Sequence, residues 1–180
     1  KWSVVKGRTI TGRDVMYWYN VERGVFIKMS GQGIEPVSVT KGMFNFFQDA
    51  GRFLFDKDTP ALGFGICGGW NERFQELRMS FRGYKDVEAW EFGRPYEKGS
   101  VVKLDGSGFD IIDLYEAVDF TGEDFPKESN KWVKIPHTNK DFYNELSIVY
   151  SEAKDTFTTK LSPKPLIYLP WRRDIVTQRY

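Results

Sequence analysis

Short segments in which apolar and polar residues alternate recur along this chain, and pairs of them flank turn-forming residues. Such alternation is typical of strands with one buried face, because successive side chains of a strand point to opposite sides of a sheet. Three β-hairpins are predicted in this way: 15–20 with 25–30, 61–67 with 76–82, and 145–150 with 156–161. The pattern therefore predicts a mainly β fold.

One stretch, 40–50, has the pattern of a short helix. Thr40 is a suitable N-cap, and Gly51 is a suitable residue after the last turn. One side of this helix would be apolar, formed by Met43, Phe44, Phe46 and Phe47. The turn at 31–33 leads into a further extended segment, 34–39.

The hairpins recur with a spacing of about 45 residues, and a gap of nearly two such periods separates the second from the third. A period of this length with strands inside each unit predicts β-propeller-like hairpin repeats over 1–89 and 137–180. Two or three such units cannot close a ring. The chain also begins without Met, so we expect it to be processed or to be a piece of a longer polypeptide.

The long gap holds a segment, 90–136, with its own pattern of strands and turns. Alternation is good at 100–104 and 132–135, and Leu114-Tyr-Glu-Ala-Val lies between them. We expect a small inserted module of three strands. The C-terminal stretch 163–177 alternates prolines with bulky apolar residues and is typical of an extended edge segment.

Charge and composition exclude several functional classes. Lys and Arg number 26 against 25 Asp and Glu, so the net charge of +1 gives no support for nucleic-acid binding. One cysteine, Cys67, and one histidine, His137, rule out a disulfide framework and metal centres rich in Cys or His. No apolar run is long enough for membrane insertion. We expect no metal and no cofactor.

Two loop-like motifs match the residue spacing of ligand sites but not the structure that such sites require. The segment 63–68 matches the glycine spacing of dinucleotide-binding turns, but a strand rather than a helix is predicted after it. A glycine-rich strand against a bulky neighbour is the favoured interpretation. The segment 105–110 resembles a calcium loop, yet Asp110 stands where the turn needs glycine. A polar hairpin turn is favoured there.

Catalysis finds little support in the sequence. His137 lies in a loop without a nucleophile-elbow motif nearby, and Cys67 lies in the most apolar predicted strand. The 25 acidic residues leave a glycosidase pair open, but no pattern singles out two of them. We therefore expect no catalytic residues and a protein that is not an enzyme.

Aromatic residues make up 17% of the chain and recur in strands and beside turns. Exposed aromatic rings stack on sugars or anchor protein interfaces, whereas buried ones fill β cores. Trp70 is distinctive because it falls in the predicted loop of the second hairpin. The candidates for an exposed binding surface are Trp70, Trp90, Tyr96, Tyr115 and Trp132.

The segments 69–81 and 148–165 share an order of elements: a strand, a polar turn, an aromatic residue and a second strand. They resemble the repeats of large tail and muzzle proteins of crAss-like bacteriophages of gut Bacteroidetes. The segment 34–38 with the following Met43-Phe-Asn-Phe-Phe is similar to a strand and short helix of those repeats.

The inserted segment reads Tyr96-Glu-Lys-Gly-Ser-Val-Val, then Leu-Tyr-Glu-Ala-Val, then Trp-Val-Lys-Ile. It resembles small carbohydrate-binding-like β modules of phage tail proteins and chitinases. Ser100 stands where those modules usually have an acidic residue, and the stretch before the second strand is longer.

Together these resemblances imply a non-enzymatic structural protein of the virion tail, acting in assembly and surface contact. Other virion or tail subunits are the expected partners, with host surface glycans as a further partner. The alternative is a carbohydrate-binding module for surface polysaccharide.

Overall fold

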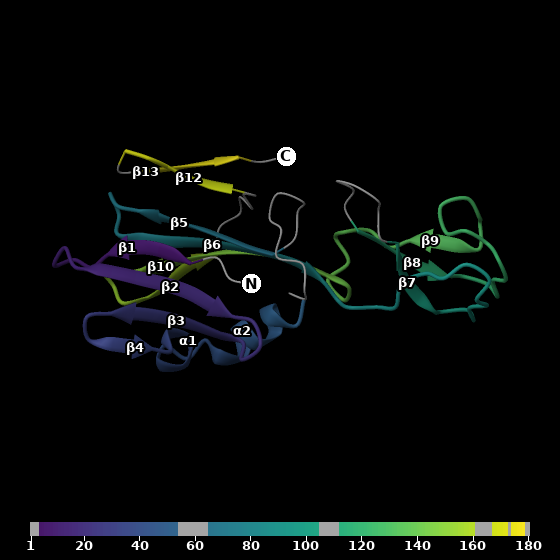
Figure 1. Cartoon of the computed structure of the whole chain (residues 1–180), viewed down its shortest axis with the longest axis horizontal. Coiled ribbons are helices and arrows are strands. Elements are labelled where there is room, and N and C mark those ends of the chain that lie inside the picture. The colour runs from purple at the N-terminus through teal and green to yellow at the C-terminus, as the bar shows by residue number, and fades with distance from the viewer. Residues whose placement is uncertain (1–3, 54–64, 105–111, 161–166, 173, 179–180) are drawn as a thin grey trace. The chain divides into compact units, whose positions relative to one another are not determined.

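The computed structural model describes residues 4–53, 65–104, 112–160, 167–172 and 174–178 (Figure 1). The described part is mainly β, as predicted, with two short helices. The strands are β1 (Val5–Arg8), β2 (Asp14–Asn20), β3 (Val25–Ser30), β4 (Gly33–Glu35), β5 (Gly65–Asn71), β6 (Glu76–Tyr84), β7 (Val101–Leu104), β8 (Asp113–Ala117), β9 (Trp132–Lys134), β10 (Tyr143–Ser151), β11 (Thr156–Lys160), β12 (Ile167–Trp171) and β13 (Asp174–Gln178).

The chain divides into two compact units. Unit 1 comprises Lys1–Tyr84 and Asn144–Tyr180, and unit 2 comprises Lys85–Tyr143. The sequence-based bounds of the insert, 90–136, fall inside unit 2. Each unit has its own buried cluster of apolar side chains.

The first sheet of unit 1 contains β1, β2, β3 and β4 in chain order, all antiparallel. The hairpin predicted at 15–20 and 25–30 is confirmed as β2 and β3, with Tyr17 opposite Lys28 and Tyr19 opposite Phe26. The second sheet has the order β11-β10-β6-β5. Read from β5, its neighbouring strands follow one another along the chain, and unit 2 is inserted between β6 and β10.

The second sheet confirms the other two predicted hairpins, with one shift. β5 continues through Asn71, so Trp70 lies within a strand, opposite Leu77, and not in a loop as expected. The turn is shorter than predicted because Gly68 and Gly69 stay in the ladder, opposite Met79 and Arg78. Positions 61–64 of this predicted hairpin lie outside the described residues.

Aromatic rings fill the core between the two sheets. Tyr17 stacks with Phe26 and with Trp70, at ring-centroid distances of 6.0 and 5.9 Å. Tyr19 meets Phe81 edge to face at 5.2 Å, which joins the first sheet to the second. Buried inward residues alternate with less buried outward ones along β2, as the period of two requires.

The helix expected over 40–50 is present as α2 (Phe44–Gly51), and a second short helix, α1 (Val37–Thr40), precedes it. Thr40 therefore ends a helix and caps none, and Gly42, with φ of 70°, separates the two. The expected extended segment 34–39 stops at Glu35, where Pro36 precedes the first helical residue. The Ser38 hydroxyl accepts a hydrogen bond from the Phe26 amide at 3.0 Å and so satisfies part of the β3 edge.

The expected C-terminal edge segment is a hairpin, β12 with β13, which packs against β5. The Tyr168 hydroxyl lies 2.9 Å from the Ser80 hydroxyl of β6. Asn71 donates a hydrogen bond to the Asp174 carboxylate at 3.1 Å. This hairpin therefore lies on the face of the second sheet that points away from the first sheet.

Unit 2 contains a three-stranded antiparallel sheet of order β7-β8-β9, at the three segments where strands are expected. Its core consists of Tyr96, Val102, Tyr115, Ala117 and Trp132. The Leu114 amide donates to the Tyr143 hydroxyl at 3.0 Å, which ties β8 to the end of the unit.

Candidate binding surfaces

Three of the five candidate aromatic residues are core residues of unit 2. Tyr96, Tyr115 and Trp132 are only 5%, 7% and 5% exposed. Trp132 donates its indole N–H to the Asp124 carbonyl at 3.0 Å and meets Tyr96 edge to face at 5.4 Å. The expectation that they form an exposed binding surface is therefore wrong, because a small unit needs its large rings to close its core.

Trp90 is half-buried, and it belongs to an aromatic group that reaches the surface of unit 2. Its ring lies edge to face against Phe92 at 6.2 Å and against Phe125 at 5.0 Å. Phe92 is 75% exposed. We call Trp90, Phe92 and Phe125 the aromatic surface of unit 2. The Trp90 indole N–H is buried and has no hydrogen-bond partner among the described residues.

Trp70 lies at the bottom of a charged surface groove in unit 1. One side of its indole rests on the backbone of Gly7, where an added Cβ would meet ring atoms at 2.6 Å. The rim carries ion pairs between Lys6 and Asp14 at 3.1 Å and between Arg8 and Glu72 at 3.7 Å. Because both Gly7 and Tyr17 contact the indole, little of its face is left for a sugar ring.

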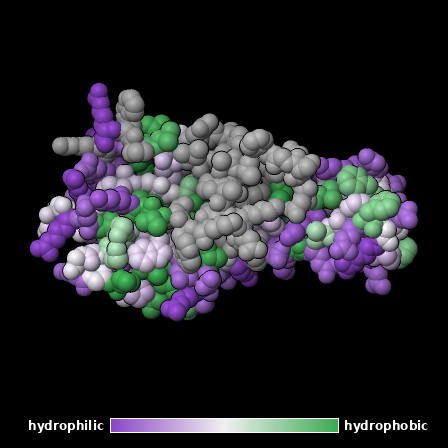
Figure 2. All heavy atoms as spheres, viewed as in Figure 1, coloured by the Kyte–Doolittle hydropathy of each residue, from purple (hydrophilic) through white to green (hydrophobic). Residues whose placement is uncertain are grey.

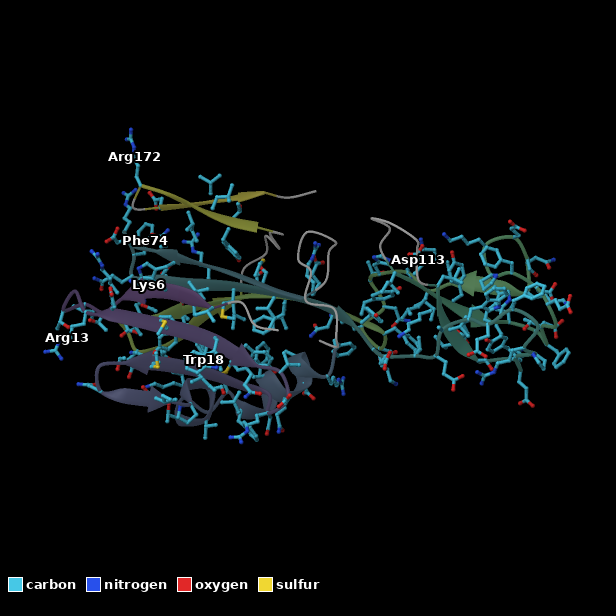
Figure 3. All side chains as sticks on the ribbon, in the orientation of Figure 1. Lys6, Arg13, Trp18, Phe74, Asp113 and Arg172 are labelled. Atoms are coloured by element: carbon cyan, nitrogen blue, oxygen red, sulfur yellow. The ribbon has the colours of Figure 1, made fainter. Side chains whose placement is uncertain are left out.

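The face of the first sheet that points away from the core carries apolar side chains over β2, β3 and β4. On the edge strand β1 the same face carries Lys6, opposite Met16, and Arg8, opposite Asp14. Met16 lies opposite Met29, and Trp18 lies opposite Ile27. The group, which we call the outer face, comprises Val4, Met16, Trp18, Ile27, Met29 and Ile34, all half-buried or exposed. Hydrophobic residues reach the surface of unit 1 in Figure 2, and Trp18 is labelled on its strand in Figure 3.

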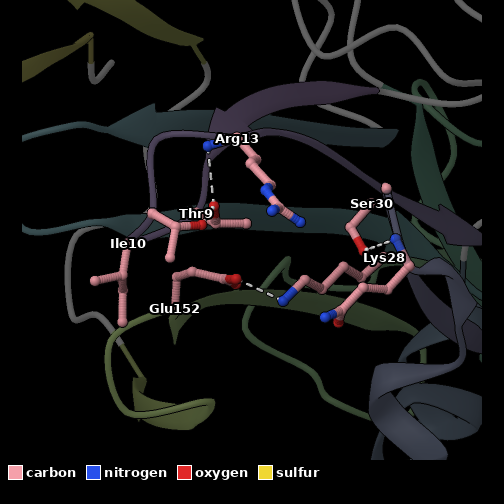
Figure 4. Close-up of a pocket in the computed structure, with 9 residues that line it drawn as sticks. Thr9, Ile10, Arg13, Lys28, Ser30 and Glu152 are labelled. Atoms are coloured by element: carbon pink, nitrogen blue, oxygen red, sulfur yellow. Dashed lines mark hydrogen bonds and ion pairs between the residues drawn. The ribbon is translucent and has the colours of Figure 1, made fainter.

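At one end of unit 1, polar side chains replace apolar ones at inward strand positions. The inward residues of β3 run Phe26, Lys28, Ser30, and those of β10 run Tyr150 and then Glu152 just past the strand. They surround a pocket of about 220 Å³, which we call the turn pocket (Figure 4). Its lining is Thr9, Ile10, Thr11, Arg13, Lys28, Ser30, Gly31, Gln32 and Glu152.

Glu152 forms the floor of the turn pocket, and its side chain is 6% exposed. One carboxylate oxygen pairs with the Lys28 ammonium at 2.5 Å, and the other accepts a hydrogen bond from the Tyr17 hydroxyl. Burial raises the pKa of Tyr17 well above its ordinary value, and the hydrogen bond to Glu152 raises it further. The phenol therefore stays protonated and acts as a donor.

A second tyrosine–carboxylate pair lies beside the first. Tyr150 donates to Asp155 at 2.5 Å, and the same carboxylate pairs with the Lys41 ammonium. Burial is the largest cause of the raised pKa of Tyr150, followed by the hydrogen bond to Asp155. The carboxylates Glu152 and Asp155 lie in a turn that the sequence marks only as polar. The available signal in the sequence was Lys28 at an inward position of β3, together with Glu152 just past β10.

Three further motifs from the sequence are His137, the glycine-rich segment 63–68 and the calcium-like segment 105–110. His137 lies 3.1 Å from the Asp113 carboxylate and stacks on Tyr143 at 4.5 Å. The described part of the glycine motif, from Gly65, lies in β5 and leads into β6, where a dinucleotide site needs a helix. The calcium-like segment 105–110 lies outside the described residues.

The described residues contain no group of three or more His, Cys, Asp or Glu side chains placed to hold a metal ion. In the same part of the chain, neither helix is long and apolar enough to span a membrane. Comparison of the chain with protein-family models, with curated proteins and with solved structures gives no match.

Proposed function

We propose that this chain is a non-enzymatic structural segment of a phage virion tail, acting in assembly and surface contact. Unit 1 contributes sheets to a larger propeller-like array, and unit 2 is a module presented for contact. Other tail subunits are its partners. The resemblance of its repeats to crAss-like tail and muzzle proteins supports the viral part of this proposal.

The sheet topology of unit 1 supports the propeller-like array. Propeller blades are four-stranded antiparallel sheets stacked face to face. The first and second sheets of unit 1 each have four strands in chain order, apart from the inserted unit 2. The β12–β13 hairpin packs on the far face of the second sheet and fits the beginning of a third blade.

The outer face of the first sheet is the observation that carries the assembly proposal. In a stacked array this face would be covered by another sheet, and its apolar side chains are suited to that. Val4 and Ile34 are 58% and 68% exposed, and they flank half-buried Trp18 and Met29. Contiguous exposed apolar patches mark interfaces, where tryptophan and methionine are enriched.

The β12–β13 hairpin, at the end of unit 1 away from the outer face, also exposes apolar side chains. Leu169 and Val176 are directly opposite each other in the β12–β13 ladder and are 51% and 50% exposed. Tyr168, one position away, points inward and is 7% exposed. The hairpin thus has an apolar face on each side, which is expected of an internal layer in a stack.

The experiment is peptide mapping of purified phage particles by mass spectrometry. We expect peptides from both units in the tail fraction, in a fixed ratio to a known tail subunit. Absence of these peptides from particles whose genome encodes the chain would overturn the proposal.

Carbohydrate binding is a second candidate function, supported by the aromatic surface of unit 2. Phe92 is exposed and lies edge to face against half-buried Trp90, so aromatic ring surface is open to solvent there, and sugar rings pack on such surface. Phage tails contact glycans on the host surface, so this function is compatible with the first.

Tryptophan fluorescence titrated with surface polysaccharides tests glycan binding. We expect Phe92→Ser to weaken binding, because it removes the exposed ring beside Trp90. Phe120→Ser is the matched control, since Phe120 is another exposed ring of unit 2, at 60%. Equal binding by the two variants would exclude the aromatic surface as the glycan site.

A further inference from the structure

The turn pocket of unit 1 combines a charged floor with a polar rim, and the structural role proposed above does not use it. We propose that the turn pocket binds one acidic sugar residue, a ring with one carboxylate and several hydroxyl groups. This inference is independent of the aromatic surface of unit 2.

The size of the pocket limits the ligand. Sites for drug-sized molecules have volumes of roughly 300–1,000 Å³. At about 220 Å³ the turn pocket is smaller, so it suits a single sugar residue or the terminal residue of a glycan.

Arg13 supplies the cation that selects a carboxylate. Lys28 is neutralised by Glu152, whereas Arg13 has no ion pair among the described residues. In Figure 4 the Arg13 side chain extends from the β1–β2 turn toward Lys28 and Ser30. A guanidinium group binds a carboxylate through two parallel hydrogen bonds, which gives both affinity and orientation.

Glu152 supplies the acceptor that selects hydroxyl groups. Its two oxygens receive one hydrogen bond each, from Lys28 and Tyr17. A carboxylate has about four lone-pair sites, so capacity remains for hydroxyl donors. A phosphate dianion carries two negative charges, whereas the described lining offers one cation without an ion pair, Arg13. A neutral sugar would leave Arg13 unpaired. A hydroxylated carboxylate satisfies both groups.

Two hydroxyls of the rim each accept one backbone hydrogen bond, and the Thr9 hydroxyl also pairs with the Thr11 hydroxyl at 3.0 Å. Thr9 Oγ1 accepts a hydrogen bond from the Arg13 amide at 3.1 Å, and Ser30 Oγ accepts one from the Gln32 amide at 3.2 Å. Because these backbone bonds use the oxygen as acceptor, the Ser30 O–H remains available to donate to a ligand oxygen. The rim therefore complements the ring and hydroxyl oxygens of a sugar.

The test is NMR titration of the isotope-labelled full chain with sodium glucuronate, with glucose and acetate as comparison ligands. We expect glucuronate to shift the amide signals of Thr9, Arg13 and Gln32 with millimolar affinity. Glucose and acetate should each bind at least about tenfold more weakly, the size of one charge-assisted hydrogen bond.

Two variants locate the effect. Arg13→Met should weaken glucuronate binding about tenfold and remove the preference over glucose. Arg23→Met is the control, because Arg23 is an exposed arginine in the β2–β3 turn at the other end of the first sheet. Both positions are exposed, so neither variant should unfold the chain.

Three results would overturn the inference: no shifts at these amides, equal affinity for glucuronate and either comparison ligand, or undiminished binding by Arg13→Met. None of them bears on whether the chain is part of a tail, since that is decided by particle composition. Conversely, a chain absent from particles could still bind glucuronate in this pocket.

Discussion

Tyr17 and Glu152 are 135 residues apart in the sequence, and the Tyr17 hydroxyl donates a hydrogen bond to the Glu152 carboxylate. Tyr17 lies in the first sheet, and Glu152 directly follows β10 of the second. The contact therefore joins the two sheets at the end of the core where the turn pocket lies. It also places a buried carboxylate between a phenol and the Lys28 ammonium.

Removing the acid should destabilise unit 1 more than removing the phenol. Glu152→Ala leaves Lys28, whose side chain is 14% exposed, without its counter-ion, which costs about 3–5 kcal/mol for a buried pair. Tyr17→Phe removes one hydrogen bond to a charged group, about 1.5–3 kcal/mol. Urea denaturation measures both.

The control for these variants is Asp14→Ala. Asp14 pairs with Lys6 at the surface, where both side chains are more than half exposed. Such pairs contribute at most about 1 kcal/mol. If Glu152→Ala were as mild as Asp14→Ala, the buried pair would not support the fold.

Stability should fall as the pH rises above about 10, the ordinary pKa of tyrosine. Burial raises the pKa of Tyr17, Tyr19 and Tyr150, and it raises the pKa of Tyr168 to about 12. A raised pKa in the folded state means that the unfolded chain loses these protons first. The stabilisation is complete below pH 10 and is lost as the pH climbs through the folded-state values.

Urea midpoints measured between pH 8 and 11 test this dependence, with tyrosinate absorbance followed in parallel. Each tyrosine that is ionised only in the unfolded chain lowers the free energy of unfolding by about 1.4 kcal/mol per pH unit. Tyr17→Phe should flatten the slope by one tyrosine. A flat profile up to pH 11 would show that the phenols ionise equally in both states.

Gly7→Ala should displace the Trp70 indole. The new methyl carbon would lie 2.6 Å from two ring atoms, so the ring or β1 must move. Overpacking of this kind costs about 1–3 kcal/mol, and Trp70 emission should shift to the red. Gly31→Ala is the control, because a methyl carbon added there would meet no atom within 4 Å beyond its chain neighbours. Equal stability of the two variants would show that β1 can shift away from the Trp70 ring without loss of stability.

Trp132→Ala should unfold unit 2 and leave unit 1 folded. The ring is 5% exposed and donates to Asp124, so its loss removes a large share of a small core, about 3–5 kcal/mol. Hydrogen exchange should show lost protection in β7 to β9 and retained protection in β2 and β6. Val133→Ala, at a half-exposed neighbour, is the mild control. Joint loss of protection in both units would contradict separate cores.

The hairpins were predictable because alternation and turn residues are local signals. The strands β2, β3, β6 and β10 follow them closely, and so do the three strands of unit 2. The helix predicted over 40–50 is present from Phe44 as α2, and it begins late because Gly42, with φ of 70°, precedes it. The extended segment predicted over 34–39 is wrong beyond Glu35, because α1 begins after Pro36.

The binding surfaces were less predictable because exposure depends on long-range packing. Trp132 and Tyr115 look like surface aromatics in sequence, yet both close the core of unit 2. Trp70 is held by Gly7, more than 60 residues away, a contact that no local pattern encodes. The turn pocket forms only where three turns meet, so no single segment predicts it. The only local indication was that Lys28 and Glu152 occupy inward positions.

Cryo-electron microscopy of the tail in purified particles tests the central proposal most directly. We expect density for unit 1 with the outer face, centred on Trp18, packed against another β-sheet, and with Leu169 and Val176 covered at the opposite end. A tail in which the outer face is open to solvent, or which lacks this chain, would contradict the proposal.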